Sequence, residues 1–267
     1  MRWLIGLAGL LAVGAAPAPR TIAPNTMVDW DARKASRSFR VADVTVTIES
    51  ADPRCPDSCE DAVPVFTVST AGMPALRITH DGSEPYGWIG IGILDKSRRP
   101  SVIIASWTGG AHCCQHIQVV VPIGDRFHAV DLGLWDGDQI VWPRDRDGDG
   151  NADFVFVDNA FLYKFDCYAC SWAPPLIKTI RGGKTVDVSA APALRSLFVA
   201  DLAKARKACL SVTEDSVRGS CAGYLADAAR LGKFAQARVE VSRLFAKDDP
   251  AFVTTVATFL REQKYLR

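Results

Sequence analysis

Short runs of alternating or consecutive apolar residues fill the chain from about residue 39 to residue 165. Turn-forming pairs separate these runs, for example Asp81 with Gly82 and Gly124 with Asp125. This pattern predicts many short strands and not alternating strands and helices. We expect strands at residues 44–48, 63–68, 75–78, 88–94, 101–107, 116–121, 127–132, 153–158 and 161–165. Their near-regular spacing predicts an antiparallel β-rich domain, built as a sandwich or in a propeller-like way.

The hydrophobic period changes to that of a helix after about residue 189. Pro192 is suited to a helix start, Gly232 to a helix end, and Asp249 followed by Pro250 to another start. Four helices are predicted, with apolar faces at residues 194–209, 217–231, 234–244 and 252–260. The chain is therefore expected to be an α+β protein. A β-rich domain at 38–185 precedes a small α-helical domain at 190–267.

The first residues have the pattern of a signal peptide. Arg2 gives a positive start, an apolar run follows to Ala16, and Val13, Gly14 and Ala15 offer a small-residue cleavage site. The run is too short to span a bilayer comfortably, although an uncleaved anchor stays an alternative. We expect a signal peptide at 1–16, a loosely ordered leader at 17–37, and no transmembrane segment after cleavage. The predicted location is periplasmic or secreted.

Cysteine content fits an exported protein, because thiols outside the cytoplasm usually form disulfides. The eight cysteines are Cys55, Cys59, Cys113, Cys114, Cys167, Cys170, Cys209 and Cys221. The sequence leaves their connectivity open. The expected pairs are Cys55 with Cys59 and Cys209 with Cys221, with cross-links between the Cys113/Cys114 and Cys167/Cys170 pairs.

Charge is balanced, with 31 basic and 30 acidic residues and no basic block. Nucleic acid and anionic membranes require clustered Lys and Arg. We therefore expect no nucleic-acid partner.

The most specific motif lies at residues 145–153. Asp145, Asp147, Asp149 and Asp153 occupy loop positions 1, 3, 5 and 9, from which carboxylates can converge on one hard cation. Glycine at position 6 permits the sharp turn, and the backbone carbonyl of Asn151 is expected as a fifth ligand. The spacing predicts a structural calcium site, because carboxylates packed this closely would otherwise repel one another.

This loop departs from an EF-hand, since Phe156 stands where a bidentate Glu would be and a strand follows in place of a helix. It resembles the calcium loops of FG-GAP and related integrin-like propeller repeats. In those families the loop leads into a strand and does mostly structural work, so the resemblance implies a stabilising metal.

A second candidate site contains His112, Cys113, Cys114 and His116. Imidazole and thiolate would suit zinc or copper, and neighbouring cysteines could form a redox pair. A glycine bend held by disulfides is favoured, because oxidised sulfur is no thiolate ligand. In an extended segment, His112 and His116 could share a face.

Cys167 and Cys170 have the spacing of a redox dithiol. A thioredoxin-type site needs a helix at the first cysteine, and Pro174 with Pro175 prevents a long one. A structural disulfide is therefore favoured over redox catalysis at these two cysteines.

Residues 221–237 resemble one tetratricopeptide helix hairpin. Gly232, Phe234 and Ala237 match its turn and small packing position, and Pro250 resembles its terminal proline. The resemblance implies contact with another envelope protein or a peptide through the helical domain.

No G-x-S-x-G, phosphate-binding loop or H-E-x-x-H occurs in the sequence. The main hypothesis is a non-enzymatic periplasmic or secreted protein, with a calcium-stabilised β scaffold and a helical interaction module. One alternative is a metal-dependent hydrolase or thiol oxidoreductase using the region from His112 to His116. Another is a carbohydrate-binding module that uses Trp88, Trp107, Trp135, Trp142 and Trp172.

Overall fold

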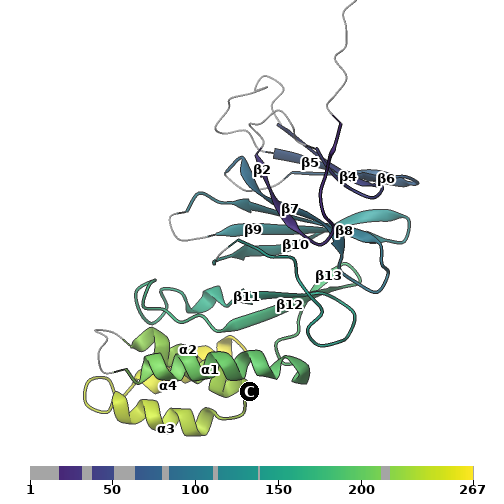
Figure 1. Ribbon diagram of the computed structural model, residues 1–267. Helices are drawn as coiled ribbons and strands as arrows, with labels where there is room; N and C mark the ends of the chain where they lie inside the picture. Colours follow the sequence, from purple (N-terminus) through teal and green to yellow (C-terminus); the bar gives the residue numbers. More distant parts are fainter. Residues whose placement is uncertain are drawn as a thin grey trace, which may run out of the picture.

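A computed structural model describes residues 18–31, 38–50, 64–79, 84–110, 114–137, 139–211 and 217–266. Within these ranges the chain forms strands in three sheets, followed by four α-helices (Figure 1). The predicted α+β class is confirmed. The predicted signal peptide at 1–16 lies outside the described residues. No helix of the described chain is both long and apolar enough to cross a membrane.

The outer sheet contains five strands from the first part of the chain. In spatial order they are β1 (Arg20–Thr21), β3 (Ser38–Val41), β4 (Val44–Ser50), β5 (Pro64–Thr70) and β6 (Met73–Thr79). Only β1 and β3 run parallel; the other neighbours are antiparallel.

The central sheet is antiparallel throughout. Its spatial order is β10 (Arg126–Trp135), β9 (Gln115–Ile123), β8 (Pro100–Trp107), β7 (Tyr86–Ile93) and β2 (Met27–Asp31). The third, small sheet has the order β11 (Asp153–Val157), β12 (Pro175–Arg181) and β13 (Lys184–Asp187).

The central sheet is covered on both faces. Ile89 and Ile104 pack on one side against Phe66 and other residues of the outer sheet. Ile103 and Val119 pack on the other side with residues of the small sheet. Burial on both faces explains why residues 101–106 of β8 are all buried, since a strand with one solvent face would alternate. The sheets are therefore stacked as a sandwich with a third layer (Figure 1).

The helices lie beyond the small sheet (Figure 1). After the 3₁₀ turn η2 (Pro192–Leu194) they are α1 (Arg195–Cys209), α2 (Arg218–Arg230), α3 (Phe234–Leu244) and α4 (Phe252–Glu262). Ile177 of the small sheet packs with Leu194 and Phe198. Residues 219–228 of α2 are all buried, so α2 forms the centre of the helical domain.

The strand predicted at 161–165 is wrong. This segment forms the 3₁₀ helix η1 (Asn159–Phe161) followed by turns. Phe161 and Phe165 contact Phe259 of α4 edge-to-face, with ring centroids 5.0 and 5.1 Å apart. These apolar side chains therefore pack in the core of the helical domain and not on a sheet.

The loosely ordered leader predicted at 17–37 is also wrong where the structure describes it. β1 joins the outer sheet, and β2 forms an edge of the central sheet. Trp30 of β2 is buried in the sandwich, and its indole Nε1 donates a hydrogen bond to the carbonyl of Ala105 at 3.2 Å. Burial of this large side chain gives a short segment enough stabilisation to be ordered.

Candidate metal centre

The acidic loop, residues 145–153, leads directly into β11. Carboxylate oxygens of Asp145, Asp147 and Asp149 all lie within 4.8 Å of one another. Gly148 and Gly150 have φ values of +79° and +82°, in the left-handed region that favours glycine. The two glycines turn the chain sharply enough to bring three of the four predicted carboxylates together, and Asp153 is not part of this cluster.

Backbone N–H groups of the loop donate to its own carboxylates. Asp145 accepts from Gly148 at 2.7 Å through Oδ1 and from Gly150 at 2.9 Å through Oδ2. Oδ1 of Asp147 accepts from the N–H of Asp149 at 3.0 Å. Oδ1 of Asp149 accepts from the backbone N–H of Asn151 at 2.7 Å and from its side-chain amide at 2.9 Å. These bonds hold the carboxylates in a fixed arrangement.

Asp153 is the buried member of the predicted ligand set, at 2% exposure. Its Oδ2 accepts a hydrogen bond from the N–H of Arg146 at 2.8 Å. Its Oδ1 is buried and has no hydrogen-bond partner among the described residues. Burial, together with the negative charges of Asp147 and Asp149, raises the pKa of this carboxyl group. A buried oxygen of this kind normally has a hydrogen-bond partner.

Asp149 carries the opposite pKa shift. Burial acts upward on its pKa, but hydrogen bonds from Asn151 and the guanidinium of Arg181 hold the pKa below its usual value. Nη2 of Arg181 forms an ion pair with Oδ2 of Asp149. Arg181 stands 32 residues later, at the end of β12, so local spacing could not indicate this contact.

Three of the four carboxylates share a common arrangement, whereas both oxygens of Asp145 accept N–H groups of the loop. In Asp147, Asp149 and Asp153, one oxygen accepts a backbone N–H of the loop and the second oxygen does not. Among the described residues, only the second oxygen of Asp149 has a partner, which is Arg181. The carbonyl of Asn151 stays a predicted ligand, and its side chain has the additional role of supporting Asp149.

Hydrogen bonds tie the loop to two sheets. The N–H of Ala152 donates to the carbonyl of Leu94, just beyond β7, at 2.7 Å. The hydroxyl of Thr179 in β12 donates to the carbonyl of Ala152 at 2.9 Å. A cleft of about 910 Å³, lined in part by Trp142, Asp145 and Gly150, lies beside the loop. A cation here would therefore strengthen the junction between the central and small sheets.

The second predicted site is described only in part. His112 and Cys113 lie outside the described residues. Cys114 is disulfide-bonded, so its sulfur is not a thiolate ligand or nucleophile. Nε2 of His116, which is buried in β9, lies 2.9 Å from Oδ1 of Asp131. His116 of β9 thus pairs with a carboxylate of the neighbouring strand β10.

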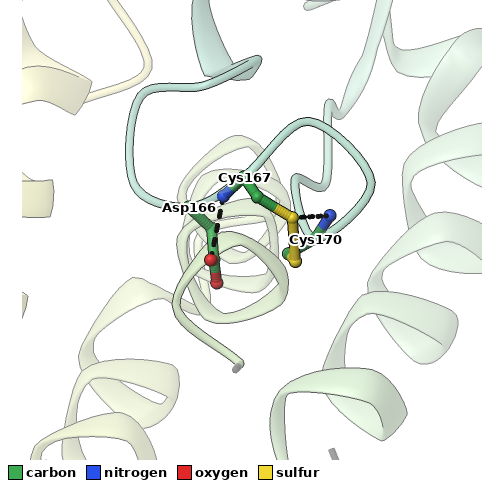
Figure 2. A group of neighbouring side chains, drawn as sticks. All are labelled: Asp166, Cys167 and Cys170. Atoms are coloured by element: carbon green, nitrogen blue, oxygen red, sulfur yellow. Dashed lines mark hydrogen bonds between the residues drawn. A yellow bond between two sulfur atoms is a disulfide. The ribbon is translucent and has the colours of Figure 1, made fainter. Parts of the chain in front are cut away.

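Cys167 and Cys170 form a disulfide with each other (Figure 2). The expected cross-link from this pair to Cys113 or Cys114 is therefore wrong. Neighbours three residues apart in a tight turn reach one another without any long-range contact. Asp166 lies beside the pair, but oxidised sulfurs make this cluster unsuitable for a metal.

The other disulfide between described cysteines is the predicted bond between Cys209 and Cys221. It ties the end of α1 to the first turn of α2, and both cysteines are buried. Cys55 and Cys59 lie outside the described residues.

None of the tryptophans considered for a carbohydrate surface is exposed. Trp135 is buried and stacks on Phe156 at a centroid distance of 4.1 Å. The remaining four are half-buried: Trp88, Trp107, Trp142 and Trp172. Trp88 and Trp142 pack against the core between the central and small sheets, and Trp172 packs against the helical core.

The fold and the loop define an α+β protein of stacked sheets and a helical domain, with a candidate cation-binding loop at the junction of two sheets. No protein-family model matches the chain, and no solved structure matches it. Over 185 residues, or 66% of the chain, it is 32% identical to a curated protein of Synechocystis sp. described as a probable thylakoid lumen protein. Over 145 residues, or 52% of the chain, it is 30% identical to an uncharacterized protein of Sinorhizobium fredii. The matches cover 54% and 23% of these relatives, so the chain spans about half the length of the first and a quarter of the second.

Proposed function

We propose that the chain is a non-enzymatic extracytoplasmic protein whose β scaffold is stabilised by a calcium ion in the acidic loop. The observation that carries the calcium proposal is Oδ1 of Asp153, a buried carboxylate oxygen with no partner among the described residues. A buried, unpartnered carboxylate oxygen is costly, and a divalent cation would satisfy it.

The chemistry of the loop favours calcium over other metals. Every candidate ligand is an oxygen, which hard cations prefer, and no imidazole or thiolate belongs to the set. Calcium accepts irregular oxygen geometry, whereas Mg²⁺ requires a nearly ideal octahedron and retains water. The ion's role would be structural, because the loop joins two sheets through Ala152.

Two observations support an extracytoplasmic location. Both the Cys167–Cys170 and Cys209–Cys221 pairs are disulfides, which persist in oxidising compartments. The Synechocystis relative is described as a probable thylakoid lumen protein, and this lumen lies outside the cytoplasm. A role of the helical domain as an interaction module stays a prediction.

Calcium should raise the melting temperature of the oxidised protein. With a dissociation constant on the order of 10⁻⁴–10⁻³ M, about 10 mM calcium stabilises the folded state by roughly 1.4–2.7 kcal/mol. For a chain of this size, that corresponds to an increase of about 3–10 °C, measured by differential scanning calorimetry.

Asp147→Asn is the sharpest variant for this experiment. The amide oxygen can still accept the N–H of Asp149, so the turn is kept while one ligand charge is removed. The calcium-dependent increase should disappear in this variant and persist in Asp125→Asn, which changes an exposed aspartate in the β9–β10 turn. An unchanged melting curve of the native sequence at this calcium concentration would refute the proposal.

A further inference from the structure

We propose that Arg181 and calcium compete for Oδ2 of Asp149, so that Arg181 sets the affinity of the acidic loop for calcium. This inference rests on the calcium site proposed above and identifies a residue that regulates it.

In Asp147, Asp149 and Asp153, one carboxylate oxygen is fixed by a backbone N–H of the loop. The second oxygen of each residue is the one that can bind a cation directly. For Asp153 this second oxygen is buried without a partner among the described residues. For Asp149 it is the oxygen that accepts from Nη2 of Arg181. The guanidinium therefore sits on a ligand atom and not at the periphery of the loop.

The position of Arg181 follows from strand register. Asp153 of β11 is opposite Thr179 of β12, and residues 179 and 181 have side chains on the same face of the strand. The hydroxyl of Thr179 contacts the loop at the carbonyl of Ala152, which shows that this face is directed toward the loop. The same face brings Arg181 to the carboxylate of Asp149.

The guanidinium of Arg181 and a calcium ion differ in charge and in the number of carboxylates that each can contact. A guanidinium remains protonated at every ordinary pH, so Arg181 keeps its positive charge throughout. It neutralises one carboxylate at the surface, whereas a divalent ion can serve the converging oxygens of Asp145, Asp147 and Asp149 together. The side chain of Arg181 is 46% exposed, against 27% for Asp149, so it can move into solvent without backbone rearrangement.

Isothermal titration with calcium chloride tests this inference on the oxidised protein. Arg181→Gln should bind calcium about two- to five-fold more tightly than the native sequence, the range expected when a partly exposed ion pair no longer has to be broken. Lys184→Gln is the matched control, because Lys184 pairs with Arg181 across the β12–β13 turn and its loss removes the same charge. The control should change the affinity by less than Arg181→Gln does.

The outcomes separate this inference from the proposed function. Equal or weaker calcium binding by Arg181→Gln, relative to Lys184→Gln, overturns the competition while leaving the calcium site intact. The absence of binding heat in the native protein and both variants, at calcium up to about 10 mM, refutes the site itself and the competition with it.

Discussion

At the scale of single residues, two aspartates are buried in different ways. Asp153 accepts a hydrogen bond from the N–H of Arg146, and its other oxygen is buried with no hydrogen-bond partner among the described residues. Asp227 in α2 is fully buried, and neither of its oxygens accepts a hydrogen bond from a described donor. Burial and contact with the carboxyl group of Asp201 raise the pKa of Asp227 to about 9, against the weaker opposing effect of Arg230. Asp227 is therefore protonated in the folded protein at neutral pH.

Asp227→Asn should make stability less dependent on pH. Because its folded pKa lies above the unfolded value of 3.8, the stability linked to Asp227 is complete below that value and is lost as pH rises toward 9. The loss approaches at most about 1.4 kcal/mol per pH unit. The side-chain amide of Asn can donate a hydrogen bond to Asp201 without taking up a proton. The free energy of unfolding of the variant should therefore exceed that of the native protein by about 1–3 kcal/mol at pH 8 and by less at pH 5. Urea denaturation at both pH values measures this, and parallel pH profiles would exclude the effect.

At the scale of elements, the helical domain was predictable and the small sheet was only partly so. Pro192 and Gly232 mark helix ends through backbone geometry that depends on local sequence. β12 begins at the second of two prolines, and Gly182 and Gly183 separate it from β13, so the strand character of both depends on pairing within the sheet, β12 with β11 and β13 with β12. The apolar residues of 161–165 gave a misleading strand signal because they pack against α4, which lies far along the chain.

The Cys167–Cys170 turn contacts α2 at Gly219. Because of this contact, we expect Gly219→Ala to lower the stability of the protein, whereas helix propensity alone predicts an increase. A Cβ on Gly219 would lie 2.1 Å from the carbonyl oxygen of Cys170, so this position accepts only glycine. Propensity alone predicts that Gly219→Ala stabilises the helix by up to about 1 kcal/mol. The clash predicts a loss of about 1–3 kcal/mol instead.

Thermal denaturation of Gly219→Ala shows whether the substitution raises or lowers the stability of the protein. The loss should be smaller when Cys167→Ser and Cys170→Ser are also present, because the turn is then free to move. A gain in stability, or the same loss in both backgrounds, would show that the backbone contact does not constrain α2.

At the scale of the whole molecule, the layers determine how the loop is used. The carboxylates at positions 145–153 could be identified from their spacing, because their convergence is local. The contribution of Arg181 could not, since it depends on the pairing of β11 with β12. The pairing of β2 with β7 is likewise set by the closure of the sandwich around Trp30 and not by the residues of β2 alone. The acidic loop lies where these layers meet, so ion binding there should affect the stability of the β region as a unit.

A crystal structure of the oxidised protein grown with calcium tests the central claim most directly. We expect one ion bound by oxygens of Asp145, Asp147, Asp149 and Asp153 at about 2.3–2.6 Å, with the guanidinium of Arg181 turned away. If Arg181 remains on Asp149 and the buried oxygen of Asp153 binds only water, the acidic loop is not a calcium site.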